Sequence, residues 1–240
     1  MLDVHPPHEA AHTWKDFFIH ISTICIGLLI AIALEQAVEA AHRASERREL
    51  LQDIQAECET NIKTLGPDVT FYRARVDWEN HAASALRAAP AAQGTITVTL
   101  PALLPVPPAM APSRAVWAVA KSSGKVALLP ENLAQVLDRV DREAEQCLLA
   151  IDRTNRAGTA LANFEVKTGT AIDPGATLHL TPSQRDELLA TLANSIGETR
   201  SSISWAAAWE GASQAVLHGV TTRGDMDAYM ERAKAAPRTQ

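Results

Sequence analysis

The sequence predicts an all-α protein in which one N-terminal transmembrane helix continues into a bundle of about four longer helices. Alanine occurs throughout the 240 residues, whereas glycine (11) and aromatic residues (5%) are few, and this composition favours helices over sheets. Residues 17–34, FFIHISTICIGLLIAIAL, contain no Asp, Glu, Lys or Arg, and such a run is just long enough to cross a bilayer. A net charge of −6 and 47% hydrophobic residues suit a folded domain and suggest no nucleic-acid partner.

The first segments are a juxtamembrane tail, residues 1–16, and the transmembrane helix, residues 17–34. Lys15 is the single Lys or Arg of the tail. A cleaved signal peptide has a basic leader and ends at a small-residue site, whereas this apolar run passes into a charged helix. We therefore expect an uncleaved anchor, with Trp14 and Phe17 at the level of the lipid headgroups.

A helical hairpin is expected over residues 35–89. A charged continuation of the anchor leads into an apolar stripe with helical spacing, and a second stripe follows Gly66-Pro67, where we expect the first helix to end. The short connection would make the two helices antiparallel. The stripes comprise Leu51, Ile54, Cys58, Ile62 and Leu65 and then Val69, Tyr72, Val76, Ala83 and Leu86.

Residues 90–112 are expected to form a Pro-rich connection. The run TITVTL has strand character, but it has no evident partner strand, and five prolines between Pro101 and Pro112 exclude a helix there. The remaining helices of the bundle are expected within 113–235. Their clearest signal is Thr181-Pro182-Ser183-Gln184, which combines an N-cap, a proline at the first helical position and a capping-box glutamine. Residues 236–240 are a tail.

His8-Glu9-Ala10-Ala11-His12 has the spacing with which a helix presents two zinc ligands and a general base. A zinc peptidase also needs a third ligand and a substrate cleft, yet only seven residues precede this motif and the membrane span begins five residues after it. His8 and His12 are therefore weak metal-ligand candidates. We expect a protein that is not an enzyme and has no catalytic residues, cofactor or metal.

Two other patterns suggest sites. Thr23, Gly27 and Ala31 are spaced by four residues, which lets two membrane helices approach closely, although small residues are also common in membrane spans. Trp205 and Trp209 lie one helical turn apart and could line a ligand pocket. Packing of these rings against small alanine side chains is the alternative explanation.

The run from His12 to Phe17 (HTWKDF), followed by GLLIA at 27–31 and Glu35-Gln36, resembles an uncharacterised group of bacterial single-pass membrane proteins. That group is similar in its H-x-W-x-x-F entry, G-x-L-I-A membrane core and E-Q exit, and the later WAVAKSSG at 117–124 is similar to its W…SSG helix. The resemblance implies the inner (plasma) membrane of a bacterium and no particular activity.

The leading hypothesis is a membrane-anchored helical scaffold or accessory subunit that acts through protein–protein contacts. Its expected partners are the lipid bilayer, a second copy bound through the membrane helix and an unknown protein. Arg43, Arg47 and Arg48 follow the span, so the positive-inside rule favours a cytoplasmic bundle. The alternative is a membrane-linked sensor whose bundle binds a small ligand, and the remote alternative is a zinc peptidase using HEAAH.

Overall fold

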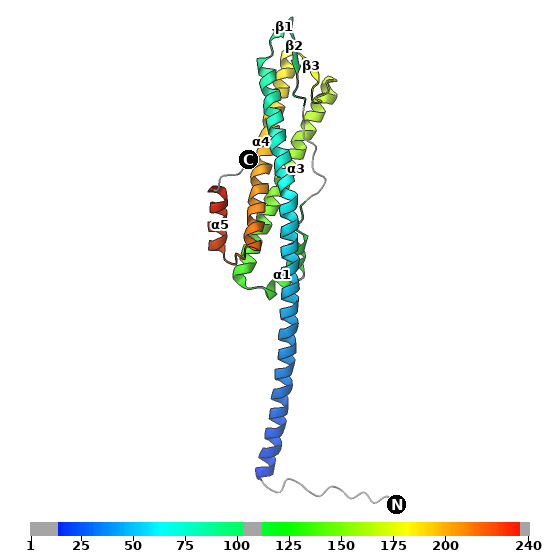
Figure 1. Ribbon diagram of the computed structural model, residues 1–240. Helices are drawn as coiled ribbons and strands as arrows, with labels where there is room; N and C mark the ends of the chain where they lie inside the picture. The colour runs from blue at the N-terminus through cyan, green and yellow to red at the C-terminus, as the bar shows by residue number, and fades with distance from the viewer. Residues whose placement is uncertain (1–13, 103–111, 236–240) are drawn as a thin grey trace, which may run out of the picture. The chain divides into compact units, whose positions relative to one another are not determined.

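The computed structural model describes residues 14–102 and 112–235. This part of the chain is almost entirely helical (Figure 1), so the all-α class and the long apolar N-terminal helix are confirmed. The chain divides into two compact units, Met1–Glu49 and Leu50–Gln240. The elements are α1 (Trp14–Ala88), β1 (Ala91–Ala92), β2 (Thr95–Thr99), α2 (Ala115–Ser122), the 3-10 helix η1 (Lys125–Leu128), α3 (Glu131–Thr168), β3 (Thr177–Leu180), α4 (Pro182–Leu217) and α5 (Arg223–Ala235).

The first unit is the N-terminal part of α1. It contains a stretch that is long and apolar enough to cross a membrane. No side chain of the described residues from Trp14 to Glu49 is buried within the chain. Large apolar side chains such as Ile24 (66% exposed) and Leu29 (65% exposed) therefore lie open on the helix surface.

The second unit is a bundle of three long helices: the rest of α1, α3 and α4. In Figure 1 α4 runs antiparallel to the other two, and the small sheet lies at the end of the bundle where α3 and α4 connect. Apolar side chains from all three helices fill successive layers of the core. Members of the central layer are Leu65, Val69, Ala144, Cys147, Ala206 and Trp209.

The predicted helical hairpin of residues 35–89 is wrong, because α1 passes through Gly66-Pro67 without ending. Proline lacks the N–H that would bond the carbonyl four residues earlier. That carbonyl belongs to Lys63, and both Lys63 and Pro67 are exposed, so water can solvate the freed oxygen. Leu65 and Val69, on either side, are buried against α3 and α4, and this packing holds the helix together.

The TITVTL run is also more than a connection. Thr95–Thr99 is β2, which pairs with β1 and, antiparallel, with β3. Ile96 lies opposite Leu180 and Val98 opposite Leu178, and all four side chains are buried. The rest of the predicted Pro-rich connection, residues 103–111, lies outside the described residues, as do 1–13 and 236–240.

The predicted start of α4 is confirmed in detail. Thr181 is the N-cap, its Oγ1 accepts from the Gln184 backbone N–H at 3.3 Å, and its own N–H donates to Gln184 Oε1 at 2.8 Å. The two reciprocal bonds satisfy donors that a helix N-terminus otherwise leaves open. At the other end of α4, α5 packs on α3 and α4 through the buried Met226 and Met230.

We expect Pro67→Ala to raise the free energy of unfolding of the bundle by roughly 1 to 3 kcal/mol, because alanine restores a helical hydrogen bond at an exposed position. Urea unfolding of the full chain in detergent, followed by tryptophan fluorescence, measures the change. Gly66→Ala is the matched control and should gain about 1 kcal/mol at most, since no side chain or other part of the fold lies within 4 Å of where its Cβ would be. A loss of stability in Pro67→Ala would contradict the uninterrupted helix.

Candidate functional site

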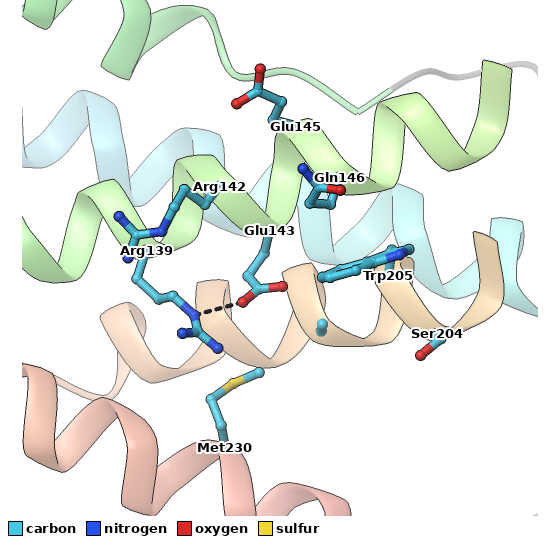
Figure 2. Close-up of a pocket in the computed structure, with 9 residues that line it drawn as sticks. Arg139, Arg142, Glu143, Glu145, Gln146, Ser204, Trp205 and Met230 are labelled. Carbon is cyan, nitrogen blue, oxygen red and sulfur yellow. Dashed lines mark ion pairs between the residues drawn. The ribbon is translucent and has the colours of Figure 1, made fainter. Parts of the chain in front are cut away.

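An open groove lies where α3, α4 and α5 meet, with a volume of about 560 Å³ (Figure 2). α3 and α4 supply most of its walls, and Met230 of α5 closes one side. The residues that line it are Arg139, Arg142, Glu143, Glu145, Gln146, Ser204, Trp205, Ala208 and Met230.

The polar part of the groove is an ion pair within α3. Arg139 Nε lies 2.6 Å from Glu143 Oε1, and the Glu143 side chain is only 7% exposed. In Figure 2 this pair lies between α3 and α4, whereas Arg142 and Glu145 extend from α3 away from it. The pair keeps the buried carboxylate compensated, as burial of a charge requires.

The apolar part of the groove lies beside this ion pair. The half-buried Trp205 ring and Gln146 occupy one side of Glu143, and the Met230 thioether lies on the other side (Figure 2). An indole face, a thioether and a nearby ion pair together suit a ligand with an apolar body and one polar group.

Only one of the two tryptophans that the sequence suggested as one pocket lines this groove, although both pack at the central core layer. Trp205 lines the groove, but Trp209 is not among the lining residues. Trp209 is 1% exposed and packs in the central core layer with Leu65 and Val69. Trp209 therefore packs among small side chains such as Ala206, which was the alternative explanation for the tryptophan pattern.

A second polar group, inside the bundle, joins α1 to α4. Glu79 is 1% exposed, and its Oε1 accepts from Arg75 Nε at 3.0 Å and from Ser195 Oγ at 2.6 Å. Arg75 Nη2 also donates to Ser195 Oγ at 3.1 Å. The sequence pattern does not predict this contact, because an Arg and a Glu four residues apart on a helix are usually an exposed pair. The partner that decides their burial comes from α4, far along the chain.

The WAVAKSSG segment has a structural position at the other end of the bundle. Trp117 is 5% exposed and its Nε1 donates to Asp138 Oδ1 at 3.2 Å. Asp141, which is 7% exposed, forms ion pairs with two basic residues. Arg114 immediately precedes α2, and Lys121 lies within α2. These contacts hold α2 against α3.

The membrane-helix candidates all lie on the exposed first part of α1. The Trp14 and Phe17 rings meet edge to face with centroids 6.0 Å apart. Thr23 Oγ1 donates to the Ile19 carbonyl at 2.8 Å, so its hydroxyl is satisfied within the helix. Gly27 has no atom within 4 Å of its Cβ position.

His8 and His12 lie outside the described residues. Within residues 14–102 and 112–235 no group of three or more His, Cys, Asp or Glu side chains is placed to hold a metal ion. Comparisons with family models, with curated proteins and with solved structures give no match to this chain. Only the sequence and the structure of this chain therefore bear on its function.

Asp68 is a buried acidic residue of α1 that lies close to Cys147 of the central layer. It is 7% exposed, and burial raises the pKa of its carboxyl to about 6. Burial also raises the pKa of the Cys147 thiol to about 12, with a smaller contribution from the Asp68 charge. The folded bundle therefore favours protonated Asp68 more than the unfolded chain does.

We expect Asp68 to make the bundle less stable as the pH rises. Its folded pKa of about 6 exceeds the ordinary value of 3.8, so its contribution to stability is complete below about pH 4 and is lost as the pH passes about 6. Asp68→Asn should therefore match the wild type at pH 4 and exceed it at pH 7.5, by on the order of 2 kcal/mol. Urea unfolding at both pH values measures this difference.

The matched control is Gln52→Asn, at an exposed position on the same helix that carries no titratable group. Its stability difference from the wild type should be the same at pH 4 and pH 7.5. If Asp68→Asn shows the same pH-independent behaviour as Gln52→Asn, the burial of Asp68 does not govern its titration.

Proposed function

We propose that this protein is a single-pass, membrane-anchored helical module that acts through protein contacts, as a scaffold or accessory subunit. The supporting observation is the exposed apolar stretch of α1, in which no described side chain is buried. An apolar surface of that extent is unfavourable in water and suits the hydrocarbon core of a bilayer. The same helix continues into the bundle, so the anchor and the folded domain are one element.

A permanent anchor fits these residues better than a cleaved leader does. The helix leaves the apolar stretch directly into a charged segment in which Arg43 Nε lies 2.7 Å from Glu39 Oε1. Cleavage next to the apolar stretch would cut through a helix that is continuous with α1 of the bundle. The acidic tail ahead of the span also lacks the basic character of a leader.

The buried charges of the bundle are engaged in contacts between its own elements. Glu79 is engaged by Arg75 and Ser195, and Asp141 by Arg114 and Lys121. Each of these carboxylates joins two or more elements, which is how buried ion pairs fix helix alignment. Such a rigid module suits the presentation of a surface to another protein, and the arginines after the span favour its presentation in the cytoplasm.

We expect the full chain to remain in the membrane fraction after an alkaline carbonate wash and to keep its N-terminus in intact-mass measurement. Ile24→Lys combined with Ile30→Lys should move most of the protein to the soluble fraction, because two charges in the span oppose insertion. Val166→Lys, at an exposed position of α3, is the matched control and should change nothing. A mature chain that begins after residue 34 would show that the stretch is a signal peptide and would contradict the anchor.

A reporter fused after Gln240 that is active only in the cytoplasm tests the side of the membrane in the same cells. Activity of this reporter would agree with the cytoplasmic location that the arginines after the span favour. Inactivity, together with activity of an external reporter, would place the bundle outside and contradict the cytoplasmic part of the proposal.

The groove at Trp205 supports a second candidate function, a membrane-linked sensor of a small amphipathic ligand. Native mass spectrometry of the purified full chain should then detect a bound small molecule. Ala208→Trp would fill the groove and remove that mass, whereas Val166→Trp, far along α3 at an exposed position, would retain it. A wild-type chain without bound mass, or a mass that persists in Ala208→Trp, would contradict this function.

A further inference from the structure

The helical segment that follows the apolar stretch has small and apolar residues on one half of its surface and charged residues on the other. At roughly 100° per residue, Leu34, Ala37, Ala41 and Ala44 lie on one half of the helix. Val38, Ala40 and Ser45 flank them on the same half. Every charged or strongly polar side chain between 34 and 46 lies on the opposite half: Glu35, Gln36, Glu39, His42, Arg43 and Glu46.

The chain itself leaves this apolar half uncovered. Leu34 is 66% exposed and Val38 is 63% exposed. From Trp14 to Glu49 no described side chain is buried, so the described part of the chain leaves the whole of this face open.

The spacing along the apolar half is that of a two-helix seam. Steps of three and four residues alternate from Leu34 to Ala37, Ala41 and Ala44, as at the a and d positions of a heptad. The same alternation extends back into the apolar stretch through Ile30, with Gly27 and Thr23 before it. One seam therefore runs from the membrane segment into the charged segment without a change of face.

We infer that a second copy of this chain packs on this seam, parallel and in register, through Leu34, Ala37, Ala41 and Ala44. The inference rests on the proposed membrane anchoring, because two copies inserted with the same topology place the same residues at the same height. Antiparallel pairing is excluded by that shared topology. The small alanine side chains let the two helix backbones approach closely.

The charge pattern suits a second copy and disfavours a charged partner. The seam has no charge between Leu34 and Ala44, so two identical faces meet without like-charge repulsion. On the outer half, Glu39 already pairs with Arg43 at 2.7 Å and Glu46 with His42 at 3.5 Å. The seam ends at Arg48, the next a position, where two copies would bring like charges together.

Cysteine cross-linking of the full chain in native membranes tests the pairing. The parent is Cys25→Ser, which removes the exposed thiol and serves as the blank for the buried Cys58 and Cys147. Single cysteines at Ala37, Ala41 and Ala44 should form disulfide dimers on mild oxidation at least several-fold more than the parent does. Cysteines at Glu39, His42 and Glu46 are the matched controls and should stay near the blank.

The outcomes separate this inference from the anchor. Dimers that are equal on both faces, strongest at the control positions or absent everywhere would overturn the paired seam while the chain remains in the membrane fraction. Cross-linked species of a mass other than twice the chain would replace the second copy by another protein. A chain that is absent from the membrane fraction would overturn the proposed anchor, and the inference with it.

Discussion

The packing of α1 against α3 and α4 is the interaction on which the rest of the structure depends. It buries Leu65 and Val69 on either side of Pro67, and so keeps a helix continuous where local sequence favours an end. The buried hydrogen bonds of Arg75 and Glu79 with Ser195 also fix how α1 aligns with α4, because they form in only one alignment of the two helices.

The first unit is a length of α1 whose side chains the rest of the described chain does not bury. An isolated helix in water is marginal unless an apolar face is buried. From Trp14 to Glu49 no described side chain is buried by the chain. The apolar stretch suits a bilayer, and the seam from Leu34 to Ala44 suits a second helix. Both surfaces need surroundings that one chain in water does not supply, which is why anchoring and association are proposed together.

In the second unit, the groove at Trp205 lies at the edge of the bundle, beside α5. α5 packs through Met226 and Met230, and its edge forms one side of the groove at Trp205. Because α5 lies outside the three-helix core, a ligand in that groove would contact the bundle without opening its central layer. Asp68, by contrast, is buried close to Cys147 of that layer, and its raised pKa couples the bundle's stability to pH.

The sequence by itself determined what local chemistry decides: the helical class, the apolar stretch and the capping box at Thr181 and Gln184. Tertiary structure decided what depends on distant partners. β2 became a strand because β3, some eighty residues later, pairs with it, and Glu79 is buried because Ser195 comes to it. Pro67 stays helical because interhelical packing outweighs a local preference. Sequence spacing identified only Trp205 among the residues that line the groove. The other walls come from α3 and α5, and no local sequence pattern predicts that these helices approach α4 there.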